Sequence, residues 1–294
     1  MAHPFLVGLV GDGVGPSLTP PMHMAEARAQ GLDYVYRTID LPTLGLGPAD
    51  VGEVLAWARR LGYDALNVTH PCKQAVLPHL DEVDPRAAAL GAVNTVVLRD
   101  GRAVGHNTDV TGFATGFATG LPDAATDEVV QLGAGGAGSA VADALLGLGV
   151  GHLVVVDVDP GRAGVLAHDL SDRYPGARVE AAEPAKLSAL LPDTDGLVHC
   201  TPTGMAAHPG LPLDADLLHA RLWVADIVYR PLDTALLLAA RANGCRVLDG
   251  GHMAVHQAVD AFRLITGTEP DPVRMLDHFR SLADSERSPR GENR

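Results

Sequence analysis

The sequence predicts an α/β protein of two domains, and three observations lead to that prediction. The chain has 294 residues, whereas a typical domain has about 100–200. Short β-rich runs alternate with longer helical stretches in both halves of the chain, which is typical of right-handed βαβ units and mostly parallel sheets. A glycine-rich segment at 133–138 lies between a predicted strand and a predicted helix, where nucleotide-binding proteins place a phosphate-binding turn.

The first part of the chain is predicted to form a small α/β domain. Its strands are the apolar runs at 5–10, 34–40, 65–68 and 94–98. Helical patterns lie between these runs, at 21–30 and 51–60.

The second series of elements begins at residue 128 and has the strand number of a doubly wound nucleotide-binding domain. Its predicted strands are 128–132, 153–157, 178–181, 197–200, 223–227 and 246–248. Helices fit between them, notably at 138–148 and 234–243. Two more helices, 252–266 and 272–283, have no strand after them, so we expect them to pack back on the first domain.

We therefore expect residues 1–112 together with 250–284 to form one domain, and residues 113–249 to form the other. The polar segment 285–294, which contains proline and glycine, is predicted to be a disordered tail.

Charge and composition limit the kinds of partner. The chain has 22 Lys and Arg against 36 Asp and Glu, a net charge of −14, which argues against nucleic-acid binding and docking on anionic membranes. No apolar run reaches the ~18 residues of a membrane span, and the N-terminus lacks the features of a signal peptide. Three scattered cysteines, Cys72, Cys200 and Cys245, favour a reducing cytoplasm over a disulfide framework.

The glycine-rich segment fits the G-x-G-x-x-G fingerprint of dinucleotide-binding domains. Gly133 allows the tight turn, Gly135 lets the backbone approach a pyrophosphate, and Gly138 lets the helix pack closely on the strand. Backbone N–H groups of Gly136 and Ala137, at the start of the helix, are then expected to face the phosphates.

The end of the next strand favours NAD as the cofactor over NADP. Asp157 lies 19 residues after Gly138, close to the ~20 expected for the acid that binds the adenosine ribose. A carboxylate there accepts hydrogen bonds from the ribose hydroxyls and repels a 2′-phosphate. Asp159 adds negative charge, whereas Arg162 is able to bind a 2′-phosphate or stack on adenine. Two carboxylates against one guanidinium favour NAD.

The first domain has polar residues at the ends of apolar strands. Because ligand groups gather at the carboxyl ends of parallel strands, we expect Lys73, Asn94 and Asp109 to converge near the mouth of an interdomain cleft. A helix N-cap is an alternative role for Asp109.

At this point the chain resembles the shikimate dehydrogenase family, and within it the quinate/shikimate dehydrogenases. The matching segments follow the order of the family over nearly the whole chain: 8–11, 17–23, 67–73, 91–95, 107–113, 133–138, 201–205, 226–231 and 250–258. The resemblance implies an α/β substrate domain built from both termini, with a Rossmann-type dinucleotide-binding domain inserted between them.

The resemblance also implies roles for single residues. Lys73 and Asp109 resemble the catalytic pair, in which Lys73 exchanges a proton with the reacting hydroxyl while Asp109 holds Lys73 in place and shares the relay. Which of the two is the formal base stays open. The residues that resemble the substrate-binding groups are Ser17 and Thr19 for the carboxylate, Thr69, Asn94 and Gln257 for the ring hydroxyls, and Tyr229 near the carboxylate. Those that resemble the groups around the nicotinamide and its ribose are Thr201, Gly204, Met205, Val228, Gly250 and Met253.

Two departures from the usual family pattern point away from a purely biosynthetic, NADPH-linked role. Ser17-Leu18-Thr19 replaces the common Ser-x-Ser and resembles the quinate-using branch. Asp157-Val158-Asp159 stands where NADP-using members usually have Asn-Arg-Thr or Asn-Arg-Ser. We therefore expect an NAD-dependent enzyme whose small-molecule substrates are shikimate and quinate.

Other functions stay open. An NADPH-dependent shikimate dehydrogenase and a non-catalytic dinucleotide-binding regulator both retain the glycine turn. His252 and His256 have the i, i+4 spacing of zinc ligands, but Met253 replaces the glutamate of H-E-x-x-H, so no metal site is expected. Ser139 lacks the G-x-S-x-G elbow of a hydrolase. The residues leave the oligomeric state open, with a homodimer as one candidate.

Overall fold

The structure is a computed structural model, and it describes residues 4–287. Residues up to Thr108 and from Gln257 onward form one compact unit, and residues 109–256 form another. We call them the first unit and the second unit. Both divisions fall within helices, α5 (Thr108–Gly120) and α10 (Gly250–Thr266), so no change of composition marks them in the sequence. The predicted boundaries, 112/113 and 249/250, lie four residues after the first division and seven residues before the second.

The first unit contains a mixed six-stranded sheet with the order β2-β1-β3-β5-β6-β4. Its strands are β1 (Phe5–Gly11), β2 (Tyr34–Asp40), β3 (Ala65–Val68), β4 (Glu82–Val83), β5 (Thr95–Arg99) and β6 (Arg102–His106). β1 is parallel to β2 and β3, whereas β5 is antiparallel to β3 and to β6. β4 is parallel to β6, so the sheet is mostly parallel as predicted, and only the two pairings of β5 depart from that prediction.

A tight hairpin explains the difference. β5 and β6 are joined by Asp100 and Gly101, whose φ angles of 54° and 76° lie in the left-handed region. An Asp-Gly pair between two apolar runs is a strong hairpin signal, because both central residues of this turn need a positive φ. That pair identifies β6, which the sequence analysis did not predict.

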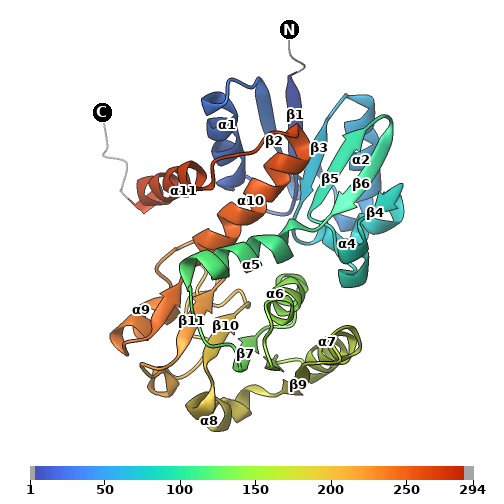
Figure 1. Cartoon of the computed structure of the whole chain (residues 1–294). Coiled ribbons are helices and arrows are strands. Elements are labelled where there is room, and N and C mark those ends of the chain that lie inside the picture. Colours follow the sequence, from blue (N-terminus) through green and yellow to red (C-terminus); the bar gives the residue numbers. More distant parts are fainter. Residues whose placement is uncertain (1–3, 288–294) are drawn as a thin grey trace. The chain divides into compact units, whose positions relative to one another are not determined.

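The two faces of this sheet bury different side chains because successive residues of a strand point to opposite sides. Val7 and Leu9 pack on one face with Ile265 of α10, whereas Val10 packs on the other face with Leu55 of α2. Figure 1 shows α1 and α10 on one side of the sheet and α2 on the other. The remaining helices of this unit are α1 (Thr19–Ala29), α2 (Val51–Arg60), α3 (Cys72–Ala75), α4 (Pro85–Leu90) and α11 (Pro272–Arg287).

The C-terminal helix α11 is joined to α1 by an ion pair between Arg274 and the buried Glu26, at 2.6 Å. Helix α11 continues to Arg287 and so includes the start of the segment predicted to be a disordered tail at 285–294. Residues 288–294 of that segment lie outside the described residues.

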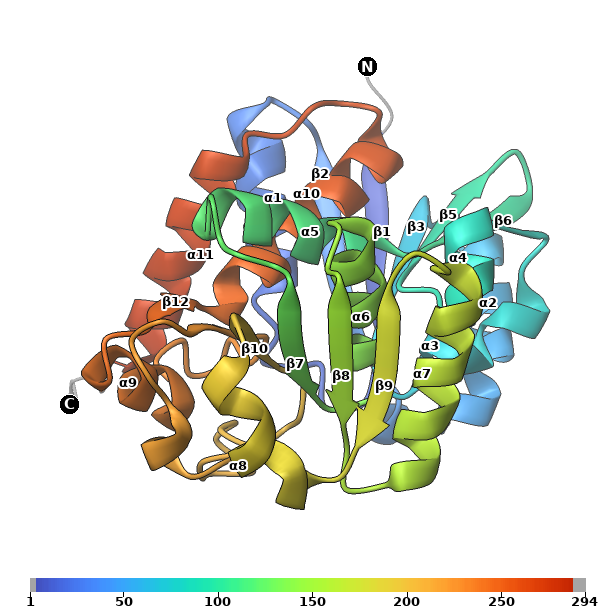
Figure 2. The same ribbon diagram turned by 60° about the horizontal axis from the view of Figure 1, so that its bottom comes forward.

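The second unit is a six-stranded parallel sheet with the order β12-β11-β10-β7-β8-β9. The chain starts in the middle of the sheet, extends to one edge and then to the other, which is the Rossmann order. Figure 2 shows β7, β8 and β9 side by side. The strands are β7 (Glu128–Leu132), β8 (His152–Val156), β9 (Arg178–Ala182), β10 (Gly196–His199), β11 (Trp223–Asp226) and β12 (Arg246–Leu248). The helices are α6 (Gly136–Gly147), α7 (Pro160–Arg173), α8 (Leu187–Leu190) and α9 (Ala235–Ala242).

The predicted fold class, α/β with an inserted Rossmann-type unit, is confirmed by this topology. Short 3₁₀ turns occupy Pro42–Leu44, Pro48–Asp50, Leu77–His79, Pro184–Lys186, Leu191–Asp193 and Ala215–Leu217. Among residues 4–287, none of the helices is both long enough and apolar enough to span a bilayer.

Candidate active site

The glycine turn between β7 and α6 has the backbone geometry that its sequence predicts. Gly133 has a φ of 101°, and a Cβ on Gly138 would lie 2.2 Å from the carbonyl oxygen of Gly133. Apart from adjacent residues and the nearby backbone of the same helix, no atom of the described residues lies within 4 Å of a Cβ built on Gly135 or Gly136. Gly133 and Gly138 are therefore required for conformational and steric reasons. The open space beside Gly135 and Gly136 lies at the start of a helix, whose N–H groups and dipole favour an anion. The turn therefore fits the pyrophosphate of a dinucleotide.

Two buried side chains hold this turn, and the sequence analysis assigned this role to neither. Gln131 donates from Nε2 to the carbonyl oxygens of Gly133 and Gly138, at 2.9 Å each. Asp157 accepts from the backbone N–H of Ala134 through Oδ2, at 2.7 Å, and from that of Asp159 through Oδ1, at 2.9 Å. A carboxylate has about four lone-pair sites, so Asp157 retains acceptor capacity for ribose hydroxyls.

The charged groups after β8 form one cluster. The guanidinium of Arg162 lies 3.6 Å from Asp157 Oδ1 and 3.6 Å from Asp159 Oδ2. Asp159 also caps α7, because its Oδ1 accepts from the backbone N–H of Arg162 at 3.1 Å. Asp157 is buried, whereas the other two side chains are half exposed. Two carboxylates and one guanidinium give this cluster a net charge of −1.

Within the second unit, the loop after β10 borders the glycine turn, and the loop after β11 borders the start of α10. A Cβ on Gly133 would lie 2.9 Å from Cys200 O and 3.0 Å from Thr201 Cγ2. A Cβ on Gly250, at the start of α10, would lie 2.5 Å from Val228 O, so only glycine fits there without displacement. The structure thus brings together the glycine turn with Thr201, and Val228 with Gly250.

The other predicted residues of these segments are placed as follows. Gly204 has a φ of 95°, in the left-handed region, and Met205 is 41% exposed in the same loop. Tyr229 directly follows Val228 and is half-buried, as is Met253 on α10.

The cysteines beside these segments are not activated thiols, and His252 is packed against a helix. Burial and the nearby Asp226 raise the pKa of the Cys200 thiol well above its usual value, and burial raises that of Cys72, so neither is an activated nucleophile. His252 packs against α5, where a Cβ on Gly116 would lie 3.2 Å from His252 Cβ.

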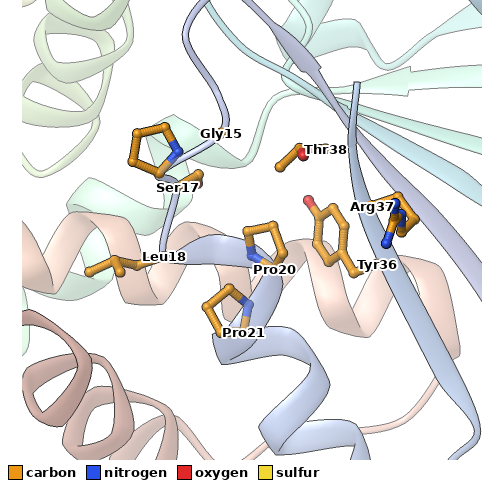
Figure 3. A pocket seen from close by; sticks show the side chains of 9 residues that line it. Gly15, Ser17, Leu18, Pro20, Pro21, Tyr36, Arg37 and Thr38 are labelled. Atoms are coloured by element: carbon orange, nitrogen blue, oxygen red, sulfur yellow. The ribbon is translucent and has the colours of Figure 1, made fainter. Parts of the chain in front are cut away.

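In the first unit, the segment that carries Ser17 and Thr19 precedes and starts α1. Ser17 Oγ accepts from the backbone N–H of Thr19 at 3.3 Å. A pocket of about 420 Å³ lies beside this segment, and its wall includes Ser17, Tyr36 and Thr38. Figure 3 shows the Tyr36 and Thr38 side chains on the side of β2 that faces the segment.

A chain of buried hydrogen bonds leads from that pocket to Asn94. Tyr36 donates to Asn67 Oδ1 at 2.5 Å, and Asn67 Nδ2 donates to Thr95 Oγ1 at 2.9 Å. Thr95 in turn donates to Asn94 Oδ1 at 3.1 Å. Asn94 then holds the start of α5, because its Oδ1 accepts from the backbone N–H of Thr108 at 2.8 Å and its Nδ2 lies 2.9 Å from Thr108 Oγ1. The sequence analysis missed Asn67 and Tyr36.

Gln257 joins the same group, since Thr108 Oγ1 lies 3.5 Å from its Oε1. Thr69 directly follows β3, and Lys73 lies half-buried in α3, where its carbonyl oxygen accepts from the N–H of Val93 at 2.9 Å. Asp109 is buried, with 6% of the residue exposed. Lys73 belongs to the first unit and Asp109 to the second, so their pairing stays a prediction.

Comparison with known proteins agrees with this geometry. A family model described as the shikimate dehydrogenase substrate binding domain matches residues 9–96. A shikimate dehydrogenase (NADP(+)) of Streptomyces avermitilis is 63% identical over 279 residues, covering 95% of this chain and 96% of the relative. The chain belongs to the shikimate dehydrogenase family. Membership confirms the predicted family and the predicted enzyme class, an oxidoreductase.

Two further proteins that are similar to this chain have NAD in their descriptions. A quinate/shikimate dehydrogenase (NAD(+)) of Corynebacterium efficiens is 52% identical, covering 94% of this chain and 98% of the relative. The solved quinate dehydrogenase of Corynebacterium glutamicum in complex with NAD has a TM-score of 0.90 at 49% identity, covering 95% of this chain and 99% of the solved one. The similarity therefore extends over both units of the family fold.

Proposed function

We propose that this chain is an NAD-dependent dehydrogenase that interconverts shikimate with 3-dehydroshikimate and quinate with 3-dehydroquinate. The first unit binds the ring substrate, and the second unit binds the dinucleotide. The match of residues 9–96 to a substrate-binding family model supports the first assignment, and the strand order with its glycine turn supports the second. The three cysteines are free thiols, which favours the cytoplasm as its location.

The acidic cluster after β8 is the observation that carries the choice of NAD. A 2′-phosphate adds about two negative charges, which the net −1 of Asp157, Asp159 and Arg162 would repel. Arg162 is already shared between two carboxylates, so it is less available as a phosphate ligand. The corynebacterial relatives named for NAD support the same choice.

In this proposal the glycine turn binds the pyrophosphate, through Gly133, Gly135, Gly136, Ala137 and Gly138. Asp157 binds the adenosine ribose, with Asp159 and Arg162 beside it. The residues that line the nicotinamide and its ribose are Thr201, Gly204, Met205, Val228, Gly250 and Met253. When bound, a nicotinamide dinucleotide supplies the acceptor or donor of a hydride.

Lys73 exchanges the proton of the reacting hydroxyl. In the oxidation, the C–H bond of the alcohol carbon breaks with its electron pair, and Lys73 receives the hydroxyl proton. In the reduction, protonated Lys73 polarises the carbonyl and returns that proton. Asp109 orients the ammonium group and shares the proton relay.

The remaining polar groups of the first unit hold the ring. Ser17 and Thr19 offer hydroxyls to the substrate carboxylate, with Tyr229 near the same end. Thr69, Asn94 and Gln257 bind the ring hydroxyls. Asn94 suits this role because its amide is held by Thr108 and Thr95, which fixes its orientation before a ligand arrives.

An NADPH-linked shikimate dehydrogenase is the second candidate, because the Streptomyces avermitilis relative is named for NADP(+). One assay separates the candidates: initial rates with shikimate and with quinate, each with NAD and with NADP. We expect higher kcat/KM with NAD for both substrates. A preference for NADP would select the second candidate, and dinucleotide binding without any hydride transfer would indicate a regulator.

A further inference from the structure

A buried row of side chains links the ends of β10 and β11. His199 and Asp226 are direct neighbours in the register of these parallel strands, and both side chains are fully buried. His199 Nδ1 lies 2.9 Å from Asp226 Oδ1, and His199 Nε2 lies 2.5 Å from Thr201 Oγ1. The row therefore runs from a carboxylate through an imidazole to the hydroxyl beside the glycine turn.

The chemistry of the groups gives each hydrogen bond a direction. Asp226 also accepts from the backbone N–H of Val228 at 3.0 Å and from Thr234 Oγ1 at 2.7 Å. An ionised carboxylate only accepts, so the proton between Asp226 and His199 is on Nδ1. A neutral imidazole with its proton on Nδ1 accepts at Nε2. With the ring in this neutral form, Thr201 donates its hydroxyl proton to His199, whereas a doubly protonated ring would itself donate to Thr201.

This direction limits what Thr201 can offer to a ligand. Its Oγ1 also accepts from the backbone N–H of Thr203, at 3.3 Å. A hydroxyl has one proton and two lone pairs, so one lone pair remains. The same order of groups activates the nucleophile of hydrolases, but there the histidine passes the proton on to the substrate. His199 is fully buried, with both ring nitrogens engaged.

We propose that His199 is a positioning residue for the dinucleotide. It keeps the Thr201 proton directed into the protein, so that Thr201 Oγ1 meets the nicotinamide half as a hydrogen-bond acceptor. The matching ligand group is an N–H or O–H donor, the carboxamide or a ribose hydroxyl. The inference rests on the proposed function, in which Thr201 lines the nicotinamide end of the site.

The first test uses the wild-type protein without ligand. Long-range ¹H–¹⁵N NMR of the imidazoles distinguishes a neutral ring protonated on Nδ1 from one protonated on Nε2 or on both nitrogens, and the His199→Asn spectrum identifies the His199 signals. We expect the neutral form protonated on Nδ1, with Nε2 bare. A protonated Nε2 would overturn the proposal, because Thr201 would then be free to donate outward.

The second test is calorimetric titration without ring substrate, using NAD or NADP, whichever binds the wild type more tightly. Asparagine at 199 keeps an N–H for Asp226 but is too short to reach Thr201. One lost hydrogen bond corresponds to roughly fivefold to tenfold weaker binding, which we expect for His199→Asn and for Thr201→Val. The double variant should bind no more weakly than the weaker single variant, because both remove one interaction. Unchanged binding in His199→Asn, or additive losses, would overturn the proposal.

Thr201→Ser is the matched control, since it retains the hydroxyl and should bind like the wild type. If His199→Asn does not fold, the comparison of Thr201→Val with Thr201→Ser decides, and equal binding by these two would overturn the proposal. In the steady state, KM for the dinucleotide should rise in His199→Asn while KM for the ring substrate stays constant. A wild type that binds neither dinucleotide would refute the proposed function instead.

Discussion

Replacing Asp157 by asparagine tests both roles that we assign to this carboxylate, holding the glycine turn and binding the cofactor. In the structure it accepts the backbone N–H groups of Ala134 and Asp159, one on each oxygen. An asparagine side chain has one acceptor oxygen and one NH₂ group. One of the two backbone N–H groups therefore faces another donor and is left without a partner, while the net charge of the cluster rises from −1 to 0.

The magnitudes follow from these losses. An unsatisfied buried N–H costs about 1–3 kcal/mol, and a domain of this size loses about 2–4 °C in Tm for each kcal/mol. A hydrogen bond to a charged group contributes about 1.5–3 kcal/mol, so NAD should bind tenfold to a hundredfold less tightly. NADP should lose less, because the repulsion of its 2′-phosphate falls with the charge of the cluster.

The assay measures Tm without ligand, and kcat/KM with each dinucleotide. Asp159→Asn is the matched control, because it removes one charge from the same cluster. Asparagine caps a helix as well as aspartate does, so Tm should stay constant in the control. If Asp157→Asn keeps both its Tm and its preference for NAD, the assignment of Asp157 to the turn and to cofactor choice is refuted.

Three further predictions concern proton transfer and stability. Lys73→Ala should lower kcat about a hundredfold or more with little change in dinucleotide affinity, as stopped-flow and calorimetry can show; near-normal turnover would remove Lys73 from the chemistry. Burial lowers the pKa of His23 from 6.5 to about 3, although the charge of Glu26 opposes this shift. Between pH 6.5 and pH 3 the imidazole is therefore protonated in the unfolded state and neutral in the folded state. Stability should fall below pH 6.5, by about 2 kcal/mol at pH 5, and urea unfolding of His23→Gln should lack this slope. Burial by itself would raise the pKa of Glu26, but hydrogen bonds, first from Arg274, hold it below its usual value. Glu26→Gln should therefore be less stable by about 1–3 kcal/mol at pH 7, and the difference should vanish as pH falls below 4.5 through the lowered pKa; a constant difference down to pH 3 would contradict this.

The sequence predicted a sheet best where the order of the strands follows directly from the alternation of strands and helices along the chain. The six strands of the second unit are short and mostly apolar runs between helices, and their number together with the glycine turn predicted the doubly wound sheet. The first sheet was predicted less well, because the Asp100-Gly101 turn reverses the chain inside what resembled a parallel series. Contacts such as that between His199 and Asp226 depend on the register of two strands, and no local pattern in the chain reveals a register.

The buried polar residues at the strand ends explain how this fold holds the loops that we propose to bind ligands. A buried carboxylate, amide or imidazole is costly unless it is hydrogen-bonded, so each one must find a partner nearby. Here many of those partners are backbone groups of the loops themselves: Asp157 holds Ala134, Gln131 holds Gly133, and Asp226 holds Val228. The central strands β3, β7, β10 and β11 are buried along nearly their whole length, so side chains at their ends hold the loops from fixed positions. Substitutions at these residues should therefore alter ligand affinity and thermal stability together, whereas substitution of Lys73 should alter turnover alone.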